Sequence, residues 1–267
     1  MNPRHVAAIA LRQYYLLRSS PTRLVPLFAW VAIDIVLWGF IARYLDRIAP
    51  HGPDFLLTLL GAALLWDFFT RIMHGVTTAF LEDVWSRNFL NLFATPLSVS
   101  EYVLGLVLTS IATSLVGLAV MLALASLAFG FPFLAYGAQF VPFVVVLFLF
   151  GIALGILASA MVLRLGPASE WLVWPIPALL SPFASVFYPL AVLPAWMQAI
   201  ARALPPSYVF EGLRALVAGK PFPLRELAWA AGLAAAQIVL AYACFVAVFR
   251  ATVRSGLLAR YSAESTA

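Results

Sequence analysis

Long apolar stretches separated by short polar segments are the feature that most limits how this chain can fold. A helix that crosses the hydrocarbon core of a bilayer needs roughly 20 mostly apolar residues, and stretches of that kind recur along the whole sequence. Hydrophobic residues make up 64% of the 267 residues and charged residues only 10%, whereas a soluble domain carries about 25% charged residues. The sequence therefore predicts an all-α membrane protein.

Six membrane spans fit these apolar stretches, and no polar segment is long enough for a separate catalytic domain. We therefore expect one membrane domain over residues 1–267. Within it we expect an interfacial helix in 1–20, spans one to five in 21–189, extracellular re-entrant helices in 190–226, and the last span with a cytoplasmic tail in 227–267. The predicted spans are Leu24–Tyr44, Phe55–Thr78, Tyr102–Phe129, Phe140–Leu163, Trp171–Tyr188 and Leu227–Arg250.

Three shorter segments predict amphipathic helices outside the spans. Residues 3–18 carry basic side chains on one side and aliphatic ones on another, a pattern typical of a helix that lies along the membrane surface. Leu193–Leu204 and Pro205–Gly219 each predict a short helix, the second with proline at its start and glycine at its end. Ten of the eighteen prolines fall between Pro167 and Pro223, so we expect a kinked fifth span and helices that dip into the membrane and return.

The distribution of Lys and Arg indicates the orientation of a membrane protein. If both termini are cytoplasmic, the six spans place nine basic residues on the cytoplasmic side and six outside. We therefore expect a multi-pass membrane protein with both termini in the cytoplasm. Because the basic residues mainly set topology, no nucleic-acid partner is expected.

The second span carries ionisable and hydroxyl side chains on one helical face. Such groups are costly inside a span and normally face a bundle interior or a water-filled cavity. The face either lines a cavity open to the cytoplasm, or belongs to a helix that extends past the bilayer with Asp67 and Arg71 as a neutralising pair. Asp34 in the first span either joins this path or bonds a neighbouring helix. The candidate substrate-path residues are Asp34, Asp67, Arg71, His74 and Thr78.

Motifs for metal or nucleotide chemistry are missing from the sequence. The three histidines are scattered, so no metal site is expected. The stretch Ala218–Pro221 contains Gly-Lys but fails as a phosphate loop, because Arg214 stands where the first glycine is needed and Pro221 where a hydroxyl residue would hold magnesium. We therefore expect no catalytic residue and no cofactor in this chain.

The segment Ala79–Ser98 is far more charged than the spans on either side of it. A helix from Leu81 to Phe93 would be longer than a connector needs, and its aromatic side chains suit docking into a groove on another protein. The alternative is an interfacial helix that lies on lipid. The sequence leaves open whether its charged or its aromatic side would meet a partner. The candidate contact residues are Glu82, Asp83, Trp85, Arg87, Asn88, Phe89, Phe93 and Pro96.

Two motifs and the six-span layout resemble the permeases of type-2 ATP-binding-cassette (ABC) exporters, a group that includes O-antigen, teichoic acid and drug exporters. Glu82–Gly105 is similar to the family's cytoplasmic segment after the second span. Tyr188–Gly219 is similar to its proline-rich stretch, tryptophan helix, Pro-x-x-Tyr turn and Glu-x-x-Arg helix. Two alternatives remain, a secondary transporter and a polytopic lipid-modifying enzyme, but the chain has neither the internal repeat of the first nor the clustered carboxylates expected of the second.

The resemblance implies two permease subunits in the bacterial inner membrane, a homodimer or a heterodimer with a related permease, that move an amphipathic, lipid-linked, polysaccharide or drug-like substrate between them. It also implies two separate nucleotide-binding subunits, which would bind ATP and magnesium, and contact with membrane lipids. Glu82–Phe93 would be the coupling helix that seats in the ATPase, and Leu193–Gly219 would form re-entrant helices at an extracellular gate. The gate residues carried over from the family are Pro189, Pro194, Trp196, Tyr208, Glu211 and Arg214.

Overall fold

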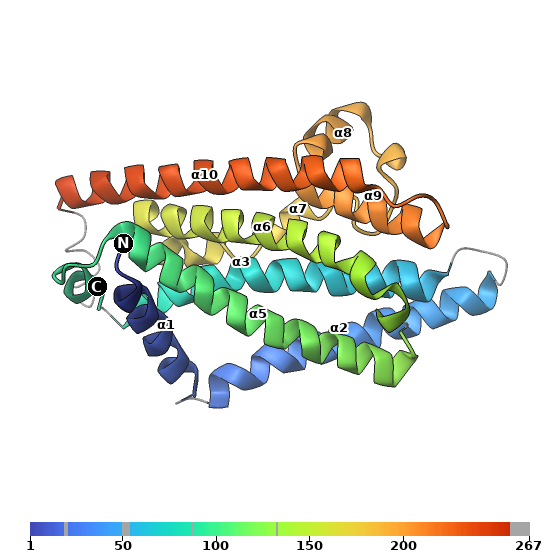
Figure 1. Ribbon diagram of the computed structural model, residues 1–267, viewed down its shortest axis with the longest axis horizontal. Coiled ribbons are helices and arrows are strands. Elements are labelled where there is room, and N and C mark those ends of the chain that lie inside the picture. Colours follow the sequence, from blue (N-terminus) through green and yellow to red (C-terminus); the bar gives the residue numbers. More distant parts are fainter. Residues whose placement is uncertain (19–20, 50–53, 87, 132, 257–267) are drawn as a thin grey trace.

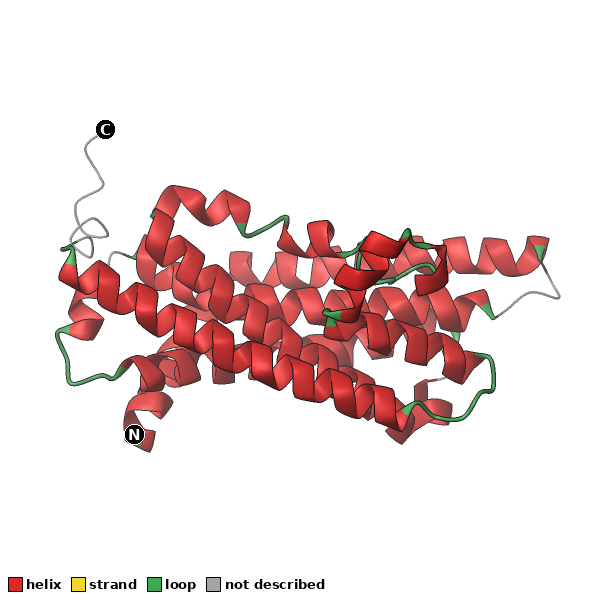
Figure 2. Cartoon of the chain, turned by 90° about the horizontal axis from the view of Figure 1, so that it is seen from above, coloured by secondary structure: helices red, strands yellow, loops and turns green. Residues whose placement is uncertain are grey.

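Helices make up the fold, and no strand occurs in the part of the chain that the computed structural model describes (Figures 1 and 2). The described residues are 1–18, 21–49, 54–86, 88–131 and 133–256. The predicted all-α class is therefore confirmed. The main helices are α1 (Pro3–Arg18), α2 (Pro21–Ile48), α3 (Gly61–Trp85), α4 (Phe89–Phe93), α5 (Val99–Phe129), α6 (Phe133–Leu165), α7 (Ile176–Leu180), α8 (Ala195–Arg202), α9 (Pro205–Val217) and α10 (Leu224–Arg254).

Four helices in the described ranges are long and apolar enough to cross a membrane, judged by length and composition. They are α3 with the π-helical turn η1 (Leu56–Leu60) before it, α5, α6 and α10. Figure 1 shows them running along the long axis of the molecule, with α2 extending along the same direction. Such a bundle of long apolar helices is the architecture of a multi-pass membrane protein.

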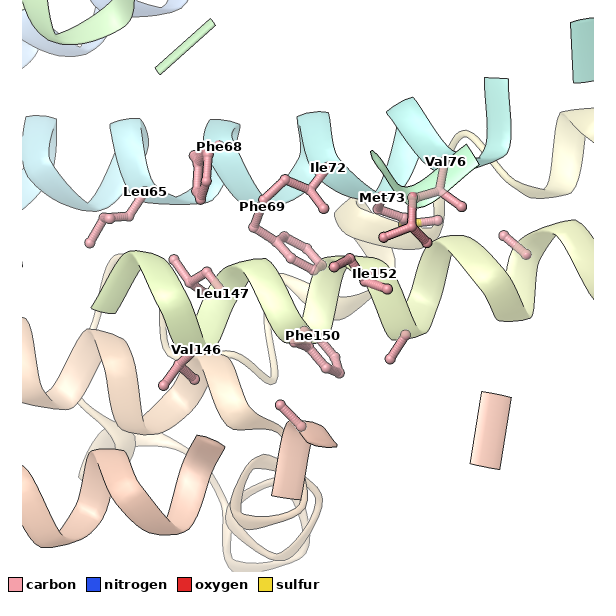
Figure 3. Packing of buried hydrophobic residues seen from close by; sticks show 14 of the residues in the cluster. Leu65, Phe68, Phe69, Ile72, Met73, Val76, Val146, Leu147, Phe150 and Ile152 are labelled. Atoms are coloured by element: carbon pink, nitrogen blue, oxygen red, sulfur yellow. The ribbon is translucent and has the colours of Figure 1, made fainter. Parts of the chain in front are cut away.

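The centre of the bundle is the contact between α3 and α6, shown in Figure 3. Gly151 and Gly155 of α6 let the two backbones approach closely, because a Cβ at Gly155 would lie 2.7 Å from the Cβ of Val76. Beside them the rings of Phe69 and Phe150 stack with their centroids 5.3 Å apart. Small residues at the interface are a common way for helices to pack within lipid, where close contact replaces the hydrophobic driving force.

The two ends of α5 show how the sequence sets helix limits. Ser98 and Glu101 form a capping box, in which each side chain accepts a hydrogen bond from the other residue's backbone N–H. At the other end Gly130 takes a left-handed conformation with φ 71° and stops the helix. The start of α5 lies near α1 and the last turns of α10, so we call this side of the bundle the α1 end (Figure 1).

The predicted fifth span, Trp171–Tyr188, is not one helix. It is divided into the 3₁₀ turn η2 (Pro167–Leu172), α7, and a run of turns that ends in the 3₁₀ turn η3 (Leu190–Val192). Proline supplies the physical reason, because each ring removes a backbone donor and clashes with the preceding turn of a helix. The prolines of this broken segment are Pro167, Pro175, Pro177, Pro182 and Pro189.

The predicted helix from Leu81 to Phe93 is also wrong as a single element. The second span continues as α3 through Trp85, the chain turns at Ser86, and the five-residue α4 follows. A straight continuation would carry Phe89 and Phe93 beyond the bundle. The turn instead buries Phe89, which is 1% exposed, against Phe80 and Tyr102. Burial of these rings therefore decides where the helix ends.

Three short helices agree with the sequence prediction. The helix α1 has the predicted limits, and α8 and α9 lie within the two predicted segments before the last span. Proline occupies the first turn of α9, and Gly219 beyond its end has φ 68°. These helices are encoded locally by their caps and amphipathic patterns, which explains why their limits could be predicted.

Candidate functional site

The α1 end holds a buried ion pair that joins three helices. Asp83, in the last turn of α3, is 0% exposed and pairs with the guanidinium of Arg12 from α1. The hydroxyl of Tyr102, from α5, donates to the other carboxylate oxygen of Asp83 at 2.8 Å. Asp83 was predicted to face a partner protein, but this side chain is directed inward and is satisfied within the chain.

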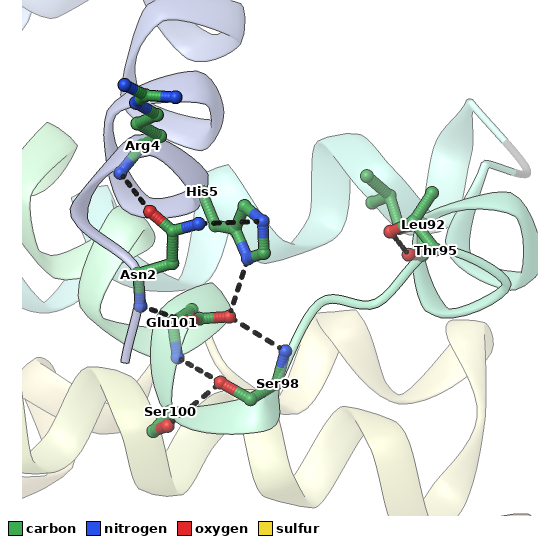
Figure 4. Close-up of polar contacts among 8 residues, drawn as sticks. All are labelled: Asn2, Arg4, His5, Leu92, Thr95, Ser98, Ser100 and Glu101. Atoms are coloured by element: carbon green, nitrogen blue, oxygen red, sulfur yellow. Dashed lines mark hydrogen bonds and ion pairs between the residues drawn. The ribbon is translucent and has the colours of Figure 1, made fainter.

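A second polar cluster links the beginning of α1 to the capping box of α5 (Figure 4). The carboxylate of Glu101 accepts hydrogen bonds from the backbone N–H of Asn2 and from that of Ser98, the latter at 3.0 Å. The Nδ1 atom of His5 lies 3.1 Å from the same carboxylate. Glu101 therefore caps its own helix and fixes the start of α1 at the same time.

Apolar packing completes the attachment of α1. Ile9 is 5% exposed and lies so close to Gly105 of α5 that a Cβ there would be 2.5 Å from the Cγ2 atom of Ile9. The side-chain amide of Gln13 donates to the backbone carbonyl of Ala79 at 3.0 Å. The helix α1 is thus part of the bundle on one side as well as a candidate for contact with the membrane surface on the other.

The predicted contact residues divide into an inner and an outer set. Phe89 and Phe93 join Asp83 in the inner set, since Phe93 packs against Tyr102 at 5.2 Å and against Phe249 of α10 at 4.7 Å between ring centroids. Glu82 and Asn88 are partly buried, and Arg87 lies outside the described residues. At the end of α3 and in its connection to α5, the exposed side chains among those that the structure describes are Trp85, Ser86, Asn91, Ala94, Thr95, Pro96 and Ser98.

Trp85 connects this outer set to the beginning of the broken segment. Its side chain is 47% exposed, and its indole N–H donates to the carboxylate of Glu170 at 2.7 Å. Glu170 belongs to η2, which follows α6 directly. Two connections that are far apart in the sequence therefore meet at one point of the α1 end.

The predicted substrate-path residues share one partly exposed face. Asp34, Asp67, Arg71, His74 and Thr78 are all partly buried, whereas the α3 residues directed at α6 are fully buried. The charges of Asp34 on α2 and Arg71 on α3 both lie close enough to act on Asp67. This face is a polar wall in which two carboxylates and one guanidinium are gathered.

The flanks of this wall come from α5 and the broken segment. The side chain of Arg71 lies across Gly117 of α5, where a Cβ would be 2.6 Å from the Cδ atom of the arginine. On the other flank the ring of His74 is 4.9 Å from that of Trp174. Among the described residues the buried Nε2 atom of His74 has no hydrogen-bond partner.

The predicted gate residues gather at α8 and α9, away from the α1 end (Figure 1). Pro189 and Pro194 precede η3 and α8, and Trp196 is 62% exposed. The hydroxyl of Tyr208 donates to the backbone carbonyl of Arg202 at 2.9 Å. Glu211 and Arg214 form an ion pair at 2.8 Å that also binds the backbone of the broken segment.

Sequence reasoning missed the internal partners of the acidic residues. A signal for Glu101 was available, because Ser98-Val99-Ser100-Glu101 fits the Ser-x-x-Glu pattern of a capping box. Arg12 and Tyr102 carry no local signal, since they lie 71 and 19 residues from Asp83 along the chain. The described residues contain no group of three or more metal-ligating side chains.

A comparison with known proteins places the chain in a family. A search of curated protein sequences finds no match. The sequence model of the ABC-2 type transporter family, in contrast, matches residues 10–217 of the 267, which includes α1 beyond its second turn, the polar wall and the gate helices. The chain therefore belongs to the ABC-2 type transporter family and is a multi-pass membrane subunit, a permease, of an ABC transporter.

Proposed function

We propose that this permease is the transmembrane subunit of a bacterial ATP-driven exporter that moves an amphipathic, lipid-linked, polysaccharide or drug-like substrate across the inner membrane. Permeases of this family work with ATP-binding subunits. The observation that carries the proposal is the α1 end, where the exposed connection from α3 to α5 rests on a buried network shared by three helices. Two nucleotide-binding subunits would bind ATP and magnesium, and both termini would be cytoplasmic.

The inward position of Asp83 and Phe89 changes which residues we assign to contact with the ATPase. The outer set, led by Trp85 and Pro96, is left as the docking surface, with partly buried Glu82 and Asn88 at its edge. The inner set would transmit the motion of the ATPase subunit. A displacement of α4 would reach α5 and α10 because the ring of Phe93 packs against those of Tyr102 and Phe249.

A second copy of the permease is the partner we propose for α2. An exposed apolar stripe follows one side of this helix and lines a shallow surface groove. Its residues recur with helical spacing, as expected for a face that packs against another helix, with lipid as the alternative contact. The groove is lined by Ala32, Ile33, Val36, Leu37, Phe40, Ile41 and Tyr44.

The polar wall is the proposed substrate path between the two copies. Charged groups within apolar helices are retained where they serve a conduit or a binding site, and the wall remains partly exposed in the single chain. In a homodimer each copy would contribute one wall, and the helices α8 and α9 would close its outer end.

Co-purification with the candidate ATPase subunit tests the proposal directly. The expected result is a complex of two permeases and two ATPase subunits whose ATP hydrolysis rises when a transported substrate is added to reconstituted vesicles. A permease that binds no ATPase subunit and forms no dimer would contradict it. Cysteine labelling from either side of the membrane, in a background that lacks Cys244, tests the orientation of the termini.

A further inference from the structure

The broken segment contains a strained turn at Ser185. This residue has φ 55°, a left-handed backbone conformation that a serine adopts only at a cost in free energy. It is 0% exposed, and within the described residues its hydroxyl has no hydrogen-bond partner. A buried polar group without a partner is rare in folded proteins and calls for an explanation. The surrounding structure must therefore hold the chain in this conformation.

Two side chains of α9 keep Ser185 and its neighbours in this conformation. Arg214 donates to the backbone carbonyl of Ser185 at 2.8 Å and to that of Val186 at 3.3 Å. Glu211 accepts from the backbone N–H of Leu190 at 2.6 Å and from Arg214 at 2.8 Å. These three backbone groups would be paired internally in a continuous helix. Here they are satisfied by one ion pair, which makes the non-helical path tolerable inside a membrane protein.

The same turn is in contact with two further helices. The ring of Phe187 stacks on Trp38 of α2, with centroids 4.4 Å apart and an interplanar angle of 12°. The ring of Phe183 packs edge-on against Trp196 of α8 at 6.1 Å. Movement of this turn would therefore displace both the gate helix α8 and α2, the helix whose exposed apolar stripe we propose as the dimer contact.

We infer that Glu211 and Arg214 form a latch that holds residues 181–190 in a strained, non-helical conformation, and that its release opens the outer end of the permease. Once released, Ser185 can return to negative φ, and its hydroxyl can bond a backbone carbonyl. In the released conformation Ser185 would have an unstrained backbone and a hydrogen-bonded hydroxyl, and in the latched conformation it has neither. Residues 181–190 can therefore adopt two conformations. The role in opening rests on the proposed function, whereas the latch itself can be tested on the permease alone.

Hydrogen–deuterium exchange on the permease in nanodiscs tests the latch. Arg214→Met should raise exchange in peptides that cover residues 181–193 by about tenfold or more, because the segment loses the arginine that holds it and its backbone N–H groups open to solvent more often. Ser185→Gly should slow exchange there, because glycine adopts positive φ without the cost to serine and carries no unpaired hydroxyl. Arg202→Met, at an exposed arginine of α8, is the matched control and should leave exchange unchanged.

Each outcome decides a separate part of the inference. Wild-type exchange in both Arg214→Met and Ser185→Gly, or an equal rise in Arg202→Met, would overturn the latch. Ser185→Gly keeps every polar contact of α9, so it remains informative if Arg214→Met fails to fold. With an ATPase subunit in vesicles, slower transport by Ser185→Gly supports the role in opening, and unaltered transport overturns that role. If exchange changes as expected but no ATPase subunit binds, the latch stands and the proposed function fails.

Discussion

Replacing Arg12 by methionine should strongly destabilise the α1 end. The substitution leaves the carboxylate of Asp83, which is 0% exposed, without its positive partner. Removing one member of a buried ion pair costs about 3–5 kcal/mol. The side chain of Arg12 is itself 25% exposed, and Tyr102 keeps its hydrogen bond to Asp83. We therefore expect the free energy of unfolding to fall by about 2–4 kcal/mol.

A double-mutant cycle isolates the pair from other effects of the substitution. Asp83→Asn removes the buried charge, so adding Arg12→Met to it should cost about 1–3 kcal/mol less than Arg12→Met costs alone. Unfolding of the purified permease in detergent, followed by tryptophan fluorescence, measures each free energy. Arg4→Met is the control, because Arg4 is exposed on the same helix. The reasoning is refuted if Arg12→Met costs no more than Arg4→Met, or if the two substitutions are additive.

Three further substitutions, with Gly232→Ala as the control for the first, test the packing, the proposed coupling and the proposed substrate path. Gly155→Ala places a Cβ 2.7 Å from that of Val76 and should lower the free energy of unfolding by about 1–3 kcal/mol. Gly232→Ala, where nothing lies within 4 Å, should raise that free energy by up to about 1 kcal/mol. Equal effects of the two substitutions would contradict the close packing of α6 on α3. Trp85→Phe loses the hydrogen bond to Glu170 and should change the free energy of unfolding by less than about 1 kcal/mol, yet reduce ATP-driven transport; unaltered transport would remove Trp85 from the coupling surface. Asp67→Asn should alter the concentration of substrate that half-saturates transport while leaving assembly with the ATPase intact, and a variant with wild-type saturation would exclude Asp67 from the path.

The parts of the fold that were predictable are those encoded by neighbouring residues. The limits of α1, α8 and α9 follow from amphipathic spacing and from proline and glycine at helix ends. The shared face of Asp67, Arg71 and His74 follows from the spacing of three and four residues along one helix. These patterns need no knowledge of the rest of the chain.

The errors arise where distant residues decide the outcome. The helix predicted to end at Phe93 ends at Trp85, because Phe89 turns back to pack on Phe80 and Tyr102. The assignment of Asp83 to a partner surface failed for a related reason. Its cation lies 71 residues earlier, and a charged residue next to aromatic ones looks the same in sequence whether its partner is internal or external.

The helix α1 is part of the bundle as well as the candidate for contact with the membrane surface that its sequence predicts. One side is fixed to the bundle through Ile9, Arg12 and Gln13, so α1 cannot leave without exposing the carboxylate of Asp83. The other side presents Tyr14 and Tyr15, which are 53% and 57% exposed, and tyrosine is a residue favoured at membrane–water boundaries. We expect such a helix to contact the membrane surface with its outer side while its inner side stays fixed to the bundle. Because α3 and α5 are both bound to α1, we expect a force applied to the connection between them to move the three helices together.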